Sequence, residues 1–253
     1  MILENSMNRL KIITEIREKL RNGKASIGSW MQIPHGSVAE ILGHAGYDWV
    51  AVDLEHGSIS THQLPDLFRA LESYGTLPLV RVSETHPKDC KKSLDAGAGG
   101  VILPVVESSN QLKAIIENCA WPPTGKRGVG FSRANLFGKH FDDYRDEAQS
   151  PIVVAQIENI RAVEALENIL MVPGLDAILI GPYDLSASMG LTGKFENQKF
   201  KSIIHKIKNL CKKYKVPCGI HVIDPNYKIL KKRQPYWINS IYISNTCCTE
   251  RLF

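Results

Sequence analysis

The feature that most constrains the fold of this chain is a regular alternation of short apolar runs with longer amphipathic stretches. The apolar runs are rich in β-branched and aromatic residues, which is typical of strands buried on both faces. They fall at residues 25–31, 47–52, 77–82, 100–106, 152–157, 175–180, 217–222 and 238–244. Stretches with helical character fall at residues 10–20, 37–42, 62–74, 87–95, 109–119, 161–170, 200–214 and 227–232. Strands that alternate with helices predict a parallel sheet built from βαβ units.

The number of these units predicts a single α/β domain over residues 1–253, folded as a (β/α)8 TIM barrel. The helix at residues 10–20 would close the bottom of its core, and Ser37 is expected to cap the helix that follows the first strand. A doubly wound open sheet is the alternative. It is disfavoured because no glycine-rich dinucleotide motif follows the first strand, and the glycines at 125–130 come after a Pro-Pro pair instead.

Composition excludes several classes of protein. The net charge is +5, but Lys and Arg are dispersed and the densest basic runs lack interleaved aromatic residues, so no nucleic-acid partner is expected. No apolar run reaches membrane-spanning length, and residues 1–22 lack an apolar signal core, so no membrane partner is expected either. The six cysteines have neither disulfide-framework nor zinc-ligand spacing. We therefore expect a cytoplasmic protein.

Polar side chains gather at the carboxyl ends of the predicted strands, where barrel enzymes carry their chemistry. They are Asp53, Glu55 and His56 after the second strand, Arg81 at the end of the third, Glu158 at the end of the fifth, Asp184 after the sixth, and His221 in the seventh. Asp184 and Glu158 could simply cap a turn or helix, and His221 is expected to be an ordinary core histidine. The convergence of the others on one rim favours a functional site.

The residue types at this rim indicate metal-assisted chemistry. Two carboxylates from neighbouring strands, here Glu158 and Asp184, suit a hard divalent cation such as Mg2+ or Mn2+, with Co2+ as a further candidate. A zinc site is disfavoured because the histidines do not cluster, and Schiff-base chemistry is disfavoured because no lysine ends a strand. Arg81 would offer a planar donor fork to an anionic oxygen, and His56 is suited to proton transfer near neutral pH.

Residues 121–144 interrupt the alternation of strands and helices. This segment is rich in glycine, arginine and aromatic residues and has no clear period. Irregular stretches of that length in a compact domain are usually functional, so we expect a loop or lid.

Five ordered motifs resemble the HpcH/HpaI family. They read Gly-Tyr-Asp-Trp-Val-Ala-Val-Asp-Leu-Glu-His-Gly, Leu-Val-Arg-Val, Trp-Pro-Pro-Thr-Gly-Lys-Arg-Gly-Val-Gly, Val-Ala-Gln-Ile-Glu and Ile-Gly-Pro-Tyr-Asp-Leu-Ser, within residues 28–222. The family contains metal-dependent (class II) pyruvate aldolases with a phosphoenolpyruvate/pyruvate-type barrel. Examples are 2,4-dihydroxyhept-2-ene-1,7-dioate aldolase and 2-keto-3-deoxy sugar-acid aldolases.

The resemblance implies reversible cleavage of a 4-hydroxy-2-oxo acid to pyruvate, or a related 2-oxo acid, and an aldehyde. Glu158 and Asp184 would hold the metal, and the 2-oxo acid would chelate it. Arg81 would donate to the keto oxygen, and the backbone amides of Tyr183 and Asp184 would hold the carboxylate. Gln156 would also contact the substrate.

The resemblance also implies how the proton moves. His56 would take the hydroxyl proton through a water on the metal, oriented by Asp95 of the motif Leu94-Asp95-Ala96-Gly97, which could act across a subunit interface. Asp53 and Glu55 would hold metal-bound waters. Near alternatives are an acyl-CoA lyase of the citrate-lyase-β type, for which no extended basic groove is found, and a catalytically silent barrel.

The tail departs from the family pattern. Residues 233–253 are unlike the family, whose last helix is absent here and commonly exchanges between subunits. We expect an incomplete C-terminal end, produced by truncation or by a shifted reading frame. A homo-oligomer, trimeric or hexameric, is expected if this C-terminus permits it.

Overall fold

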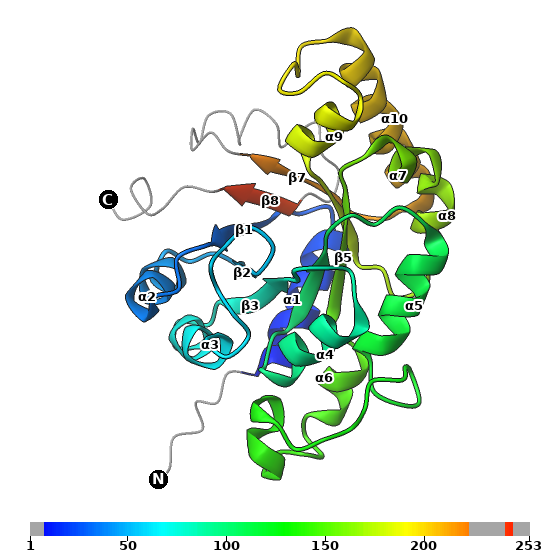
Figure 1. The fold of residues 1–253 in the computed structure, drawn as a ribbon. Helices are drawn as coiled ribbons and strands as arrows, with labels where there is room; N and C mark the ends of the chain where they lie inside the picture. The colour runs from blue at the N-terminus through cyan, green and yellow to red at the C-terminus, as the bar shows by residue number, and fades with distance from the viewer. Residues whose placement is uncertain (1–7, 223–240, 245–253) are drawn as a thin grey trace.

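The computed structural model describes residues 8–222 and 241–244. Its strands pair in parallel with their neighbours in chain order to make a curved sheet (Figure 1). The first seven strands are β1 Ser26–Met31, β2 Trp49–Asp53, β3 Leu77–Arg81, β4 Gly100–Leu103, β5 Ile152–Ile157, β6 Ala177–Ile180 and β7 Cys218–Val222. The prediction of a parallel α/β sheet is therefore confirmed.

A short eighth strand, β8 (Ile241–Ser244), pairs with both β7 and β1 and brings the last strand of the sheet against the first. The helix predicted at residues 227–232 lies outside the described residues, and so do residues 233–240 and 245–253 of the tail. The complete (β/α)8 barrel, with a helix after every strand, consequently stays a prediction.

Helices cover the outside of the sheet (Figure 1), with α2 against α3, α4 against α5 and α8 against α10. The described helices are α1 Arg9–Arg21, α2 Gly36–His44, α3 Leu64–Glu72, α4 Pro87–Asp95, α5 Ser109–Cys119, α6 Arg145–Gln149, α7 Ile160–Glu164, α8 Leu166–Leu170, α9 Pro182–Ser188 and α10 Gln198–Tyr214. None of these combines the length and the apolar character that a membrane-spanning helix needs.

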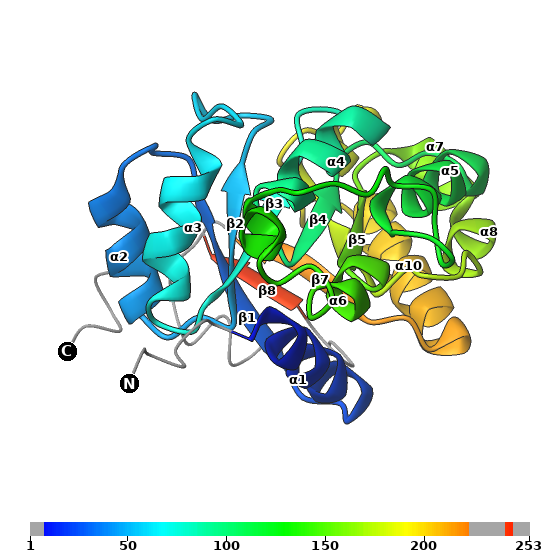
Figure 2. The ribbon, with the colours of Figure 1, turned by 90° about the horizontal axis from the view of Figure 1, so that it is seen from below.

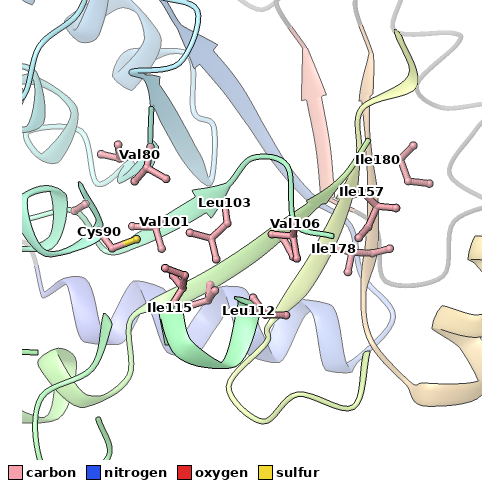
Figure 3. Packing of buried hydrophobic residues seen from close by; sticks show 14 of the residues in the cluster. Val80, Cys90, Val101, Leu103, Val106, Leu112, Ile115, Ile157, Ile178 and Ile180 are labelled. Atoms are coloured by element: carbon pink, nitrogen blue, oxygen red, sulfur yellow. The ribbon is translucent and has the colours of Figure 1, made fainter. Parts of the chain in front are cut away.

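Side chains along each strand alternate between two apolar layers. In β2, Val50 and Val52 belong to the outer layer, between the sheet and the helices, whereas Trp49 and Ala51 belong to the inner layer. Figure 3 shows part of the outer layer, where Leu103 of β4 lies near Leu112 of α5. Because both layers are apolar, strands β2 to β6 are buried on both faces, as their β-branched composition predicts.

The inner layer changes character along the strands. Its base is apolar and is closed by Ile13, Ile16 and Leu20 of α1, as predicted, with α1 lying across the amino end of the sheet (Figure 2). Toward the carboxyl end, the same alternation places Asp53 at the end of β2 and Arg81 at the end of β3. Polar side chains therefore lie at the carboxyl end of an otherwise apolar interior.

Gly28 is required by the packing of this base. A Cβ at Gly28 would lie 2.3 Å from the indole ring of Trp49, which is buried and donates from Nε1 to Ser26 Oγ at 3.1 Å. Any side chain there would displace the Trp49 ring from the inner layer.

Two local predictions were wrong. The helix after β1 is capped by His35, whose Nδ1 accepts from the Ser37 amide at 3.2 Å, so Ser37 lies inside the helix. The predicted helix at 161–170 is divided at Ala165 into α7 and α8, with Asn159 capping α7 through two backbone amides.

The long segment before β5 is an ordered part of the amino end of the sheet, where the chain passes from the end of α5 to the start of β5. It contains a 3-10 helix, η1 Arg133–Gly138, and a small apolar core built around Trp121 and Tyr144. Arg127 is buried against both rings and donates to the Tyr144 hydroxyl at 3.0 Å. The segment thus lies at the opposite end of the sheet from the polar strand ends of its own chain, and its role as a functional loop or lid stays a prediction.

Candidate active site

Asp53 and Arg81 form the centre of the polar cluster. The parallel register sets Asp53 of β2 beside Arg81 of β3, so their side chains meet without any loop to position them. Arg81 donates from Nε and Nη2 to the two carboxylate oxygens of Asp53 at 2.8 and 2.5 Å, a bidentate arrangement that fixes both groups. Both side chains are buried, Asp53 completely.

Asp53 is ionised in this setting. Burial opposes its negative charge, but the hydrogen bonds and charge of Arg81 outweigh burial and lower the pKa of Asp53 below its usual value. Gln32 Nε2 donates to the same carboxylate at 2.8 Å, and the amides of Glu55 and His56 donate at 3.0 and 3.3 Å. Asp53 therefore holds the loop after β2 and the guanidinium of Arg81 together.

Arg81 is held on three sides. Its Nη1 lies 3.0 Å from Glu55 Oε2, an ion pair whose atoms are not aligned for a hydrogen bond. The guanidinium also lies over the ring of Trp30, 4.4 Å from its centroid. Because a guanidinium carries five N–H groups and two of them donate to Asp53, one N–H on Nη2 and those on Nη1 are left to donate to a ligand.

Glu158 follows β5 and is almost completely buried. The Val105 amide donates to its Oε1 at 2.5 Å, and Gln156 Nε2 donates to its Oε2 at 2.7 Å. Burial, with the negative charges of Glu55 and Asp184 close by, raises the pKa of Glu158 to about 7, although the Val105 hydrogen bond opposes this. Glu158 is thus only partly ionised near neutral pH.

Gly181 makes room for this carboxylate. A Cβ at Gly181 would lie 3.0 Å from both Cβ and Oε2 of Glu158. Gly181 is also the residue before α9, so the same glycine leads the chain from β6 into the helix that carries Asp184.

Asp184 and Tyr183 lie in the first turn of α9, a short helix that was read from the sequence only as a segment following the sixth strand. Both side chains are exposed, and the Tyr183 ring meets Phe195 edge to face at 4.9 Å. The charge of Asp184 acts on both Glu55 and Glu158, which places the three carboxylates around one region. Burial raises the pKa of Glu55, with Asp184 adding to the effect and Arg81 opposing it.

His56 and Asp95 are not brought together within the chain. His56 is exposed on the loop after β2, at the carboxyl end of the sheet. Asp95 ends α4, and the chain begins β4 only five residues later at Gly100, so Asp95 lies at the amino end. Burial raises the pKa of Asp95, while Arg127 and Lys91 oppose that shift.

His221 packs its ring against Trp30, with centroids 5.5 Å apart, and is half-buried.

Three residues of the site are not identified by the sequence analysis: Trp30, Gln32 and Val105. Trp30 and Gln32 lie at the carboxyl end of β1 and just beyond it, so the strand-end rule that identified Arg81 applies to them as well. Val105 contributes its backbone amide, and a contact of that kind cannot be predicted from the residue type.

The net charge of the cluster indicates what it can bind. One buried guanidinium faces the carboxylates of Asp53, Glu55, Glu158 and Asp184, so negative charge is in excess. The Oε1 atom of Gln156 is also buried without a hydrogen-bond partner. Within the part of the chain that the structure describes, no set of three His, Cys, Asp or Glu side chains surrounds a metal-sized point. Carboxylate oxygens in excess of the nearby positive charge are the donor chemistry that suits a hard cation.

The fold and the site define an α/β enzyme with an acid cluster and one arginine at the carboxyl ends of parallel strands. Residues 26–228 match the model of the HpcH/HpaI aldolase/citrate lyase family, and the chain belongs to that family. It is 36% identical over 197 residues to a hydroxypyruvate/pyruvate aldolase of Roseobacter denitrificans, covering 77% of each chain. It is 35% identical over 216 residues to a 2-keto-3-deoxy-L-rhamnonate aldolase of Salmonella gallinarum, covering 83% of this chain and 79% of that one.

A solved structure supports the same assignment. The crystal structure of an HpcH/HpaI aldolase/citrate lyase family protein from Burkholderia cenocepacia superimposes with a TM-score of 0.84 at 30% identity, covering 91% of this chain and 92% of the other. The resemblance drawn from the five motifs is confirmed, and the chain is a lyase of the aldolase type.

Proposed function

We propose that this enzyme is a divalent-metal-dependent aldolase that cleaves a 4-hydroxy-2-oxo acid reversibly to pyruvate, or a related 2-oxo acid, and an aldehyde. The observation that carries the proposal is the charge imbalance at the carboxyl end, where a single arginine lies among four carboxylates. Two aldolases similar to this chain are named for hydroxypyruvate and pyruvate and for 2-keto-3-deoxy-L-rhamnonate, which are all 2-oxo acids.

Glu158 and Asp184 would hold the cation, Mg2+ or Mn2+ and with less preference Co2+. When bound, the ion stabilises the negative charge that develops on the keto oxygen as the carbon–carbon bond breaks. Glu55 would accept from the waters that complete its shell, and Asp53, whose oxygens already accept from Arg81, Gln32 and two amides, would act by holding Arg81 in place. Ionisation of Glu158, which has a pKa of about 7 without the ion, would accompany binding.

Arg81 would donate its remaining N–H groups to the keto oxygen of the substrate. Its bonds to Asp53 and its stacking on Trp30 hold the guanidinium still, so the donors are already in place before the negative charge forms. The free backbone amides of Tyr183 and Asp184, in the first turn of α9, would hold the substrate carboxylate. Gln156 Oε1 would accept a hydrogen bond from substrate or water.

His56 would accept the hydroxyl proton, either directly or through water. Because Asp95 lies at the other end of its own sheet, it could orient His56 only from a neighbouring subunit. We therefore propose a homo-oligomer, trimeric or hexameric, in which the amino end of one subunit meets the carboxyl end of another. We further propose one complete (β/α)8 domain and a cytoplasmic location, which the four described cysteines support because all are free thiols.

The test of the function is pyruvate release from a panel of 4-hydroxy-2-oxo acids, measured with Mg2+, with Mn2+ and after chelation by EDTA. We expect release that requires the ion and is restored by adding it back. An acyl-CoA thioester in the same assay tests the citrate-lyase-like alternative, and full activity in EDTA would refute the metal mechanism.

The test of the shared site uses two inactive variants, His56→Ala and Asp95→Ala. Co-expressed, they should form mixed oligomers in which some sites carry both native residues, so activity should return. His56→Ala alone should lose aldol cleavage more severely than deuterium exchange into the pyruvate methyl group, since enolisation does not involve the hydroxyl proton. Equal losses would mean that His56 positions the enolate.

A further inference from the structure

The connection between β4 and α5 bends sharply at Val105. Its backbone φ is +49°, in the left-handed region, where a β-branched residue is rare and strained. The Val105 side chain is exposed, whereas Pro104 before it and Val106 after it are both buried. Packing of the side chain therefore does not explain why valine adopts this conformation.

The bend has one evident consequence, which is the direction of the Val105 amide. Its N–H donates to Glu158 Oε1 at 2.5 Å, across from β4 to the end of β5. One residue later the chain returns to the core, where Val106 lies in the outer apolar layer with Leu103 and Leu112 (Figure 3). The strained residue thus lies between a buried anchor and the carboxylate that it contacts.

Gln111, in the first turn of α5, holds the bend from the other side. Its Nε2 donates to the Val105 carbonyl at 3.3 Å, and its Oε1 accepts from the Glu107 amide at 2.9 Å. In an ordinary capping box, the third helical residue bonds to the amide of the cap residue, which here is Ser108. Gln111 instead reaches past Ser108 to the bend, so its side-chain amide clamps the connection while its backbone N–H donates to the Ser108 cap.

Glu107 ties the same connection to the end of β5. Its Oε1 accepts from Asn159 Nδ2 and lies 2.8 Å from Arg161 Nη2. Asn159 directly follows Glu158 and caps α7. The connection after β4 and the carboxylate after β5 are therefore linked twice, once through Val105 and once through Glu107.

We propose that Gln111, supported by Glu107, is a positioning residue that keeps Val105 in its left-handed conformation and so keeps the Val105 amide on Glu158. The Val105 amide on Oε1, together with Gln156 Nε2 on Oε2, orients the carboxylate, and the remaining lone pairs of the two oxygens would face the cation. This role rests on the metal site of the proposed function. Gln111 itself touches neither the metal nor the substrate.

The experiment measures the affinity of the metal-free protein for Mn2+ alone by isothermal titration calorimetry. Gln111→Ala frees Val105 to relax to negative φ, so Mn2+ affinity should fall about tenfold or more, the scale for losing a partner of a metal ligand. Val105→Gly in the Gln111→Ala background should restore most of that affinity, because glycine adopts the left-handed conformation without strain and keeps its N–H.

Asn118→Ala is the matched control. Asn118 also lies on α5 and also donates its side-chain amide to a backbone carbonyl, that of Ala114 at 2.8 Å, but far along the helix from the bend. Its Mn2+ affinity should equal that of the wild type. Thermal unfolding of each metal-free variant checks that the fold is intact.

The possible outcomes distinguish the positioning role of Gln111 from the metal site on which that role depends. Wild-type affinity in Gln111→Ala would overturn the positioning role while leaving the metal site in place. A loss that Val105→Gly fails to restore would show that Gln111 acts through the start of α5 and would also overturn the role. A wild-type protein that binds no Mn2+ would overturn the metal site and this inference together.

Discussion

Buried arginines and carboxylates occur at both ends of this sheet, but in different proportions. At the amino end, Arg9 pairs with Glu147 at 2.7 Å and with Glu72 at 3.1 Å, and Arg133 pairs with Glu72 at 2.5 Å. Two positive charges thus meet two negative charges. The remaining donors of Arg9 and Arg133 are directed at the carbonyls of Ala134 and Ala96.

At the carboxyl end, one arginine meets four carboxylates. Arg81 neutralises Asp53 and part of Glu55, while within the described ranges neither Glu158 nor Asp184 forms an ion pair. The amino-end cluster ties α1, α3, α6 and the long segment before β5 together, and the guanidinium of Arg127 is buried beside it, so positive charge there at least balances negative charge. Among the described residues, the carboxyl-end cluster instead carries more carboxylates than cations, and we propose that it is a binding site rather than a structural network.

The largest contrast between the two ends should come from removing a single carboxylate charge. Glu158→Gln or Asp184→Asn should lower turnover about a thousandfold, since a metal ion contributes several kcal/mol and each 1.36 kcal/mol is tenfold in rate. Glu72→Gln at the amino end should leave turnover unchanged in correctly folded protein. Steady-state pyruvate release and Mn2+ titration measure both effects, and equal losses at the two ends would remove the distinction.

A smaller contrast is expected when an arginine is replaced by lysine at each end. Arg81→Lys keeps the charge but loses the planar fork, so turnover should fall roughly a hundredfold, the scale for losing one preorganised donor. Arg133→Lys should affect stability and leave turnover alone. The measurement is kcat at saturating metal, and wild-type kcat in Arg81→Lys would assign Arg81 a purely structural role.

The stability of the fold should instead depend on the amino-end network. Arg9→Ala leaves Glu147 and Glu72 buried with fewer partners, so the free energy of unfolding should fall by about 3 kcal/mol, as for other broken buried pairs. Turnover measured well below the unfolding temperature should not change. Urea denaturation gives the free energy, and an unaltered unfolding midpoint would show that the amino-end network does not stabilise the fold.

The smallest expected effect is a pH dependence of the stability of the metal-free protein. The pKa of Glu158 is about 7 when folded, above the usual 4.5, so the folded state binds its proton more tightly than the unfolded state. Stability from this group is therefore present at low pH and lost as pH rises through 7, by about 2 kcal/mol between pH 5.5 and 8.5.

Glu158→Gln provides the control for that measurement, because it keeps the shape of the side chain and cannot titrate. Urea unfolding at the two pH values, in EDTA, should show a smaller loss of stability in the variant than in the wild type. Identical losses would mean that the Glu158 carboxyl is already ionised near neutral pH without a cation.

Much of the fold and most of the candidate site could be predicted from strand ends. Asp53, Arg81, Glu158 and Asp184 each end or closely follow an apolar run, and parallel strands bring their carboxyl ends to one edge. The register of β2 with β3 then makes Asp53 and Arg81 neighbours. The alternation of strands and helices by itself determined which residues end a strand. This is because the hydrophobic periodicity and apolar character of a segment are properties of its own residues.

Tertiary structure decided what each of these residues does. It set Trp30 under Arg81, gave two of the Arg81 donors to Asp53, and turned the Val105 amide onto Glu158. It also carried Asp95 and the segment at 121–144 to the amino end, away from the site of their own chain. These results depend on distances between segments far apart in the chain and on a backbone amide that every residue except proline possesses. Residue identity alone therefore carries no signal for them.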